Sequence, residues 1–420
     1  MASRYRWGLG AALMALLVPL GALVPPAVAS GPEPPSQDPF YTYSGPTPLR
    51  AVPPGTVLRQ RSVQLAFGPG NSTPISAEQL LYRTTDQLGH ATATVTTVLT
   101  PTPDPVVPRI VGYLSFYDGL GSRCDPSYTL AGGDPGDSTY AQEAEEEELL
   151  ITWYLSQGDI VTVPDFEGTR LDWMTGHESG YGTLDALRAT ESYLRIGADT
   201  EVGLSGYSGG AVAADWASEL APSYAPKVNI VGVAEGGIPA NYLDHFAYIN
   251  GTAEYSAAIP GELLGLSRAY GVDLKRYMSP FGLEVVQQEA NTCIASDFGK
   301  YPGLTISSIM LPAYRNLAQV APFASVLRDQ TMGTAKTHPG EPLLMGVGNV
   351  DGKGDGAMVA ADVKALARHY CAEGVPVDYQ EYSGASHTEA GAYFDPETGP
   401  FLQGRFAGAP TVSNCSSLGS

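Results

Sequence analysis

A glycine-rich stretch around Ser208 contains the side chain best suited to act as a nucleophile. Gly206-Tyr207-Ser208-Gly209-Gly210 fits the pattern G-x-S-x-G, with an apolar run at 202–204 before it and helix-forming residues at 211–217 after it. This context predicts a serine on a sharp turn between a strand and a helix. Small neighbours are needed because the serine backbone is strained and larger side chains would clash. The alternative is a plain Gly/Ser-rich turn or a phosphate loop, but no lysine follows the glycines.

A serine nucleophile needs a base, and the pKa of histidine suits that role near neutrality. His387 lies in a short loop directly after the last predicted strand, 377–382. Hydrolases built on a doubly wound sheet deliver their histidine from this place. His369 lies inside a predicted helix, 358–371, where a structural role is favoured. The histidines of the chain are His90, His177, His245, His338, His369 and His387.

Two aspartates, Asp351 and Asp355, could orient this histidine. Both lie in the loop 348–356 after a predicted strand at 342–347, and the order serine, acid, histidine is the one this fold requires. The unused aspartate would be a turn or helix-cap residue. A calcium loop is a third interpretation, but the EF-hand glutamate is missing. The residues alone leave both aspartates as candidates.

Acyl transfer also requires hydrogen-bond donors for a developing oxyanion. The backbone N–H of Gly209, directly after the nucleophile, is expected to be one donor. The second should come from the loop Tyr117-Asp118-Gly119, which follows a predicted strand at 109–116. No HGGG run is present, so this loop differs from the usual esterase motif.

Alternating strands and helices predict the scaffold that brings these residues together. Apolar strands are expected at 109–116, 159–163, 202–204, 228–233, 342–347 and 377–382, after a β-rich section that includes 63–67 and 91–99. Helices are expected at 140–157, with a solvated acidic face, and at 183–196 and 358–371. This alternation favours an α/β protein with a doubly wound, mostly parallel sheet.

The strand–helix alternation stops between residues 236 and 340, where only short helices are expected, at 242–248, 261–270 and 311–326. An insertion between two sheet strands predicts a mainly helical cap over the site. The expected organisation is therefore a core first part at 30–235, with an N-terminal arm at 30–54, the cap at 236–340, and a core second part at 341–420.

The first 29 residues predict export. Arg4 and Arg6 precede an apolar run at 8–24, and Ala27-Val28-Ala29 provides a cleavage signal. No later apolar run is long enough to span a bilayer, so a secreted chain without integral membrane association is expected. Without residues 1–29 the net charge is −23, which disfavours nucleic acids and anionic membranes as partners.

Four cysteines, Cys124, Cys293, Cys371 and Cys415, indicate two disulfides in an exported chain. Three pairings are possible. The cysteines are too dispersed for a zinc cluster, and no metal or cofactor is expected.

The chain resembles the secretory lipase family of α/β-hydrolases. The resemblance covers nearly the whole mature chain and rests on residues 206–210, on Phe116-Tyr117-Asp118, on Val163-Pro164-Asp165-Phe166-Glu167-Gly168, and on the spacing of Asp355, Cys371 and His387. It implies that Asp118 supplies the second oxyanion N–H and that Asp355 is the triad acid. It further implies the disulfides Cys124–Cys293 and Cys371–Cys415, the first of which would tie the oxyanion loop to the cap.

The expected function is a triacylglycerol lipase that acts through Ser208, His387 and Asp355. The cap stretches 306–314 and 320–324 would suit an acyl tunnel, although plain cap packing explains them equally well. A carboxylesterase for short or polymeric esters is the near alternative. A serine peptidase, or a non-catalytic binding protein on a hydrolase scaffold, are further alternatives. The sequence does not predict an oligomeric state.

Overall fold

A nine-stranded sheet forms the centre of the protein. The computed structural model describes residues 31–66, 72–133 and 138–419, so the predicted signal peptide at 1–29 lies outside the described residues. The spatial order of the strands is β1-β2-β3-β5-β4-β6-β7-β8-β9. Their bounds are β1 Val57–Ala66, β2 Ser72–Thr85, β3 Ala91–Thr100, β4 Arg109–Leu114, β5 Ile160–Pro164, β6 Glu201–Tyr207, β7 Asn229–Gly236, β8 Leu343–Asn349 and β9 Val377–Ser383.

The sheet has an antiparallel part and a parallel part. β1, β2 and β3 pair antiparallel, and β3 also runs antiparallel to β5. From β5 through β4, β6, β7 and β8 to β9 every pairing is parallel. The carboxyl ends of the parallel strands therefore meet at one edge, where the loops of the site begin.

Helices cover both faces of the sheet because the strands alternate their apolar side chains. In β4, Ile110 belongs to the core cluster on the face of α3 and α4. Its neighbours Val111 and Tyr113 belong to the cluster that includes residues of α2 and α11. Helix α10 packs on β8 and β9. The bounds of these helices are α2 Ser138–Ser156, α3 Gly176–Leu194, α4 Gly209–Tyr224, α10 Ala360–Ala372 and α11 His387–Phe406, and a short α1 spans Pro126–Thr129.

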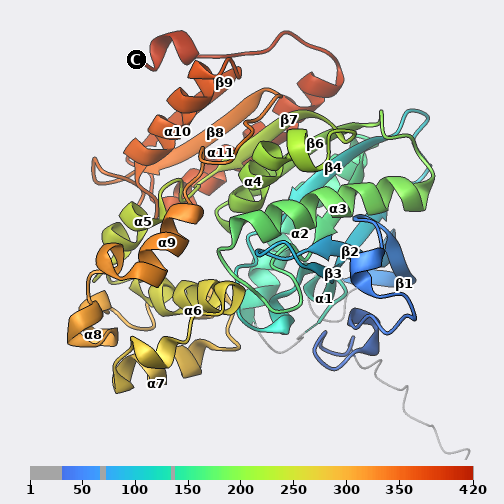
Figure 1. Ribbon diagram of the computed structural model, residues 1–420. Coiled ribbons are helices and arrows are strands. Elements are labelled where there is room, and N and C mark those ends of the chain that lie inside the picture. Colours follow the sequence, from blue (N-terminus) through green and yellow to red (C-terminus); the bar gives the residue numbers. More distant parts are fainter. Residues whose placement is uncertain (1–30, 67–71, 134–137, 420) are drawn as a thin grey trace, which may run out of the picture. The chain divides into compact units, whose positions relative to one another are not determined.

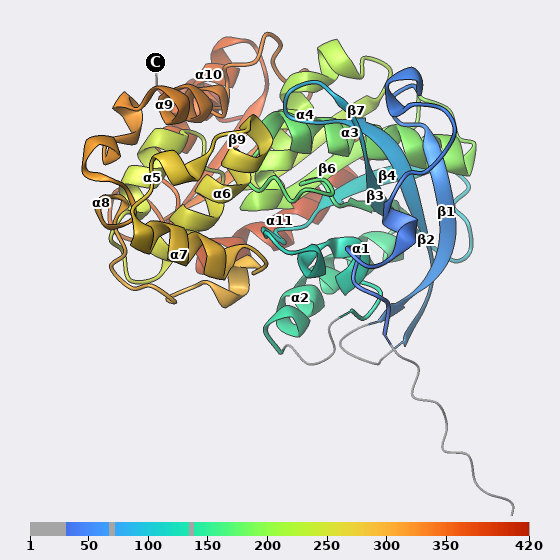
Figure 2. The same ribbon diagram turned by 60° about the horizontal axis from the view of Figure 1, so that its bottom comes forward.

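All residues between β7 and β8 are described, and they form helices and loops but no strand. Figures 1 and 2 show it in yellow-green to orange, grouped on the opposite side of the protein from β1–β3. Its α-helices are α5 Tyr242–Ile249, α6 Ala258–Tyr270, α7 Pro280–Glu289, α8 Ile306–Ile309 and α9 Ala321–Asp329. The residues from Gly31 onward pack as one compact unit, and the cap boundaries at 236 and 340 stay predictions.

Two local expectations were wrong. The stretch 311–326 is not one helix: α9 begins only at Ala321, because Pro322 is tolerated in the first turn of a helix but not in its interior. The acidic face of α2 is not wholly solvated. Glu147 and Glu148 are buried, and the carboxylate of Glu147 accepts hydrogen bonds from Ser115 Oγ (2.7 Å) and Phe116 N–H (2.9 Å). Glu147 thus supports the loop after β4.

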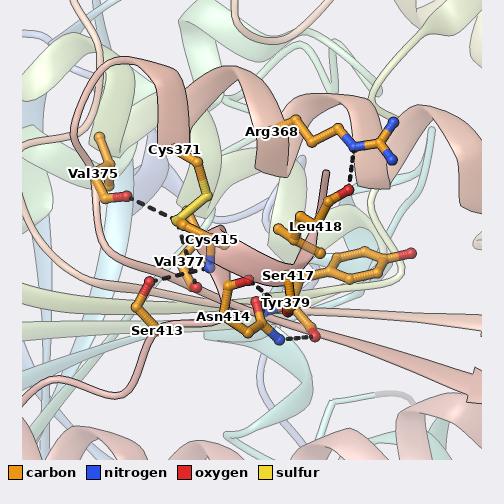
Figure 3. The surroundings of a disulfide bond; sticks show 10 residues. All are labelled: Arg368, Cys371, Val375, Val377, Tyr379, Ser413, Asn414, Cys415, Ser417 and Leu418. Carbon is orange, nitrogen blue, oxygen red and sulfur yellow. Dashed lines mark hydrogen bonds between the residues drawn. A yellow bond between two sulfur atoms is a disulfide. The ribbon is translucent and has the colours of Figure 1, made fainter. Parts of the chain in front are cut away.

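The two disulfides are Cys124–Cys293 and Cys371–Cys415, which are the pairings that the family resemblance implied. The second joins α10 to the C-terminal segment, as Figure 3 shows. That segment also lies along the edge strand β9: the side chain of Asn414 bonds both the N–H (3.0 Å) and the carbonyl (2.7 Å) of Tyr379. The C-terminal segment therefore covers backbone groups that an edge strand would otherwise expose.

Candidate active site

Ser208 lies on the turn between β6 and α4, with a φ of +53°. Steric crowding explains why glycine occupies positions 206 and 210 of the motif. A Cβ on Gly206 would lie 2.4 Å from the carbonyl of Gly210, and a Cβ on Gly210 would lie 1.9 Å from the carbonyl oxygen of Leu114. Such contacts are shorter than packed atoms allow. The spacing G-x-S-x-G is therefore what lets α4 start directly behind β6 and leaves the serine side chain at the edge of the sheet.

Three predicted site residues meet at this edge. His387, in the first turn of α11 after β9, lies with Nε2 2.9 Å from Ser208 Oγ. Its Nδ1 lies 2.9 Å from Oδ2 of Asp355, which follows β8. Asp355 and His387 are both buried. The ends of β6, β8 and β9 thus bring serine, acid and histidine into one hydrogen-bonded chain.

The structure distinguishes the two candidate aspartates. The second oxygen of Asp355, Oδ1, accepts the backbone N–H groups of Ala357 (2.9 Å) and Met358 (2.6 Å), so the carboxylate is fixed from both sides. Asp351 is exposed and caps its own turn through the N–H groups of Lys353 and Gly354. The Gly354 N–H, above all, lowers the pKa of Asp351. Asp351 is a turn residue.

Asp118 and Gly209 adjoin each other, as the oxyanion prediction requires. A Cβ on Gly209 would lie 1.8 Å from Asp118 Oδ1, so the carboxyl of Asp118 lies directly against that backbone. Burial, followed by the nearby charge of Glu262, raises the pKa of Asp118 to about 8. This shift favours the protonated, uncharged form of the carboxyl near neutral pH.

Residues of the segment between β7 and β8 bond to the loop that contains Asp118. The carbonyl of Asp118 accepts the N–H of Ile294 (2.8 Å), and the N–H of Leu120 donates to the carbonyl of Thr292 (2.9 Å). The disulfide Cys124–Cys293 closes the same contact. The predicted link between the oxyanion loop and the predicted cap segment is thus present, through backbone as well as sulfur.

A pocket of about 550 Å³ opens above Ser208. It is lined by Ser208, Gly209, Asp118 and His387 and by a mostly apolar wall. Residues of that wall include Trp173, Met174, Ile249, Tyr255, Ile294 and Met358. Such a cavity suits an apolar ligand whose polar centre lies at the serine. The histidines His90, His177, His338 and His369 do not line it.

Sequence reasoning missed one polar pair in this pocket. His245 of α5 and Glu262 of α6 are both buried, with Nε2 of His245 3.1 Å from Glu262 Oε1. The sequence offers His245 only as one of several possible bases and gives no signal for Glu262. The two residues come from separate helices of a region without sheet periodicity, so no spacing rule could have paired them.

The sheet topology and the strand–turn–helix at Ser208 define an α/β-hydrolase fold. The solved structure of Candida antarctica lipase A in its closed state is similar, with a TM-score of 0.82 and 29% identity over 91% of this chain and 89% of that one. The family model described as secretory lipase matches residues 138–414. The chain belongs to the secretory lipase family.

Two relatives differ in what is said of their activity. A secreted triacylglycerol lipase of Malassezia furfur is 31% identical and aligns over 90% of this chain and 78% of its own length. A protein of Mycobacterium tuberculosis described as a probable inactive lipase is 34% identical, over 90% of this chain and 84% of its own. Family membership supports ester hydrolysis as the class of reaction.

The described residues also bear on other classes of site. Within 31–66, 72–133 and 138–419, none of the helices combines the length and apolar character needed to cross a membrane. In the same ranges, no group of three or more His, Cys, Asp or Glu residues is arranged to hold a metal ion.

Proposed function

We propose that this protein is a secreted serine hydrolase that cleaves carboxylic esters, with triacylglycerols as the favoured substrates. The observation that carries the proposal is the chain Ser208–His387–Asp355, with two contacts of 2.9 Å, beneath an apolar pocket. Serine, histidine and a buried carboxylate in this order form a nucleophile, a general base and the group that orients the base.

In the proposed reaction, Nε2 of His387 accepts the proton of Ser208 as Oγ attacks the ester carbonyl. Asp355 keeps Nδ1 protonated and stabilises the imidazolium that forms. The tetrahedral intermediate then collapses, the ester C–O bond breaks, and His387 gives its proton to the departing alcohol. Water attacks the acyl-enzyme with the same base and releases the carboxylic acid.

The N–H groups of Asp118 and Gly209 are the proposed donors to the oxyanion. An ionised carboxylate beside them would repel the negative charge of the tetrahedral intermediate. The pKa of Asp118 is raised, chiefly by burial, and this favours the neutral form of that carboxyl. Burial of Asp118 therefore favours the proposed transition state as well as the packing of the loop.

The apolar pocket and the Malassezia furfur relative support a lipid ester as substrate. Export is supported by the family and by two disulfides, which persist in oxidising compartments. An inactive binding protein is the second candidate, because the Mycobacterium tuberculosis relative is described as a probable inactive lipase. The hydrogen-bonded site described above favours activity.

The test is hydrolysis of p-nitrophenyl esters from butyrate to palmitate, together with tributyrin and triolein emulsions and a peptide panel. We expect ester hydrolysis by the wild type and a loss of roughly 10⁴-fold or more in Ser208→Ala, with unchanged folding. Triolein cleavage would separate a lipase from a short-chain esterase. Full ester activity in Ser208→Ala would contradict the proposal, and a wild type that cleaves nothing would favour the binding protein.

A further inference from the structure

His245 and Glu262 lie behind the triad acid, and nothing in the mechanism above uses them. His245 is 4% exposed and Glu262 is 3% exposed. Nδ1 of His245 lies 3.1 Å from the carbonyl oxygen of Ala357, and Nε2 lies 3.1 and 3.2 Å from the two oxygens of Glu262. We propose that this pair is a positioning device that holds Asp355 in its catalytic orientation. The inference rests on the proposed function.

The protonation of the pair follows from its partners. The carbonyl of Ala357 can only accept a hydrogen bond, so Nδ1 of His245 must carry a proton. Nε2 faces a carboxylate, which also accepts. Burial opposes a charge on His245, but Glu262, the carbonyl of Ala357 and the charge of Asp355 together raise the pKa of His245. Both ring nitrogens of His245 face acceptors, and the raised pKa favours the form that donates from both, which suits His245 to anchoring rather than to general-base catalysis.

One peptide unit connects this anchor to the triad. The carbonyl of Ala357 and the N–H of Met358 belong to the same peptide bond. The carbonyl accepts from His245 (3.1 Å), and the N–H donates to Oδ1 of Asp355 (2.6 Å). A donor on the carbonyl side polarises the peptide and strengthens the bond made by its N–H. The chain Glu262–His245–peptide–Asp355 thus leads directly to His387.

The pair also lies outside the sheet that supplies the triad. α5 and α6 belong to the segment between β7 and β8, whereas Asp355 follows β8 itself. Glu262 additionally influences Asp118, whose pKa its charge raises. The pair of His245 and Glu262 therefore adjoins both the loop of Asp355 and the loop of Asp118. The positions of α5 and α6 then help to set the orientation of Asp355.

The experiment compares two double variants that differ by one amide. His245→Asn/Glu262→Gln keeps a donor near the Ala357 carbonyl and leaves no unpaired buried charge. His245→Leu/Glu262→Gln has nearly the same shape and no donor at position 245. Both are measured with p-nitrophenyl butyrate, in the wild-type background and in the Asp355→Asn background. His177→Phe is the control, because His177 is also largely enclosed, bonds Gln87, and does not line the pocket.

We expect the leucine variant to lose about ten- to a hundredfold in kcat with little change in KM, because a small displacement of a catalytic group is costly. The asparagine variant should recover most of that loss. With Asp355→Asn already present, the two double variants should differ by less than about twofold, because residues that act as a unit are not additive. A merely structural effect would instead lower kcat by the same factor in both backgrounds.

Equal kcat for the two double variants, or the same difference in both backgrounds, overturns the inference. If the leucine variant does not fold, Glu262→Gln decides the matter in the Asp118→Asn background, where no ionisation at position 118 can change the rate. A lower kcat at unchanged KM is expected there, and an unchanged kcat overturns the inference. Ser208→Ala in the same assay separates the two proposals. Activity that survives Ser208→Ala overturns the proposed function, whereas its loss alongside equal double variants overturns only the positioning role.

Discussion

Two histidine–carboxylate pairs meet at the same pocket, one from the sheet edge and one from the helical segment, and His387, His245 and Glu262 line it. His387 pairs with Asp355, and His245 pairs with Glu262. The two pairs differ in what the second ring nitrogen of the histidine contacts, the nitrogen that does not face the carboxylate. That of His387 faces Ser208 Oγ, a group that can give up a proton, whereas that of His245 faces a carbonyl that can only accept. A histidine beside a carboxylate is therefore suited to act as a base in one place and as an anchor in the other.

The largest expected effect is on kcat when His387, the proposed base, is replaced. His387→Gln keeps a hydrogen-bonding side chain but removes the base, and we expect kcat for p-nitrophenyl butyrate to fall by roughly 10⁴-fold or more. His369→Gln, at an exposed position on α10, should leave kcat unchanged. A His387→Gln enzyme within tenfold of wild type would remove the distinction between the two histidines.

The acids offer a second, matched comparison. Asp355→Asn should lower kcat by about 10³–10⁴-fold, because an amide cannot hold the required histidine tautomer. The kcat of Asp351→Asn should stay within about twofold of the wild-type value, since Asp351 only caps a turn. Steady-state kinetics on both variants, with circular dichroism as the folding control, checks this. The reverse ranking would transfer the acid role to Asp351.

The third prediction concerns pH. The pKa of Asp118 is raised to about 8, so its carboxyl is neutral below that pH and ionised above it. Ionisation places a negative charge at the oxyanion site, and kcat should fall about tenfold per unit of pH on the alkaline side. Asp118→Asn, which cannot ionise, should abolish this decline.

Glu262 connects this pH dependence to the positioning pair. Its negative charge is one of the causes that raise the pKa of Asp118. Glu262→Gln removes that charge, so the alkaline decline should move to lower pH. A pH–rate profile that does not move would show that Glu262 and Asp118 are not coupled.

The disulfides give the smallest expected effect. The bond Cys124–Cys293 closes 169 residues and Cys371–Cys415 closes 44. Chain entropy then predicts that the paired serine variant of the first loses about 1 kcal/mol more unfolding free energy than that of the second. Only the first variant should also lose activity, because it loosens the loop of Asp118. Urea unfolding and kcat on both variants measure the two effects, and equal activity losses would contradict this account.

The sequence predicted the parts whose position is set by the sheet. The order serine, acid, histidine and the alternation of apolar strands placed Ser208, His387 and an acid from the loop 348–356 together, because parallel strands end at one edge. The choice of Asp355 over Asp351 came from the family resemblance. It did not predict strand β2, whose stretch 78–83 mixes buried polar with apolar side chains. It also missed the helical continuation of α11, which contains Pro396 and Pro400. In both, tertiary packing overrides local propensity.

The site was harder to predict where no periodicity exists. The sequence predicts a solvated face for Glu147, because a run of glutamates normally faces water. Its burial depends on Ser115 and Phe116, which lie on another element. The pair of His245 and Glu262 likewise arises from contacts between two helices, which only the folded chain brings together.

The measurement that tests the central claim most directly is covalent labelling of the native protein. A p-nitrophenyl alkylphosphonate reacts with a serine only where a base activates it and donors stabilise the oxyanion. Peptide mass spectrometry should find one phosphonate per chain, on Ser208, with a stoichiometric burst of p-nitrophenol. Labelling at another residue, or none in a folded wild type, would contradict the account.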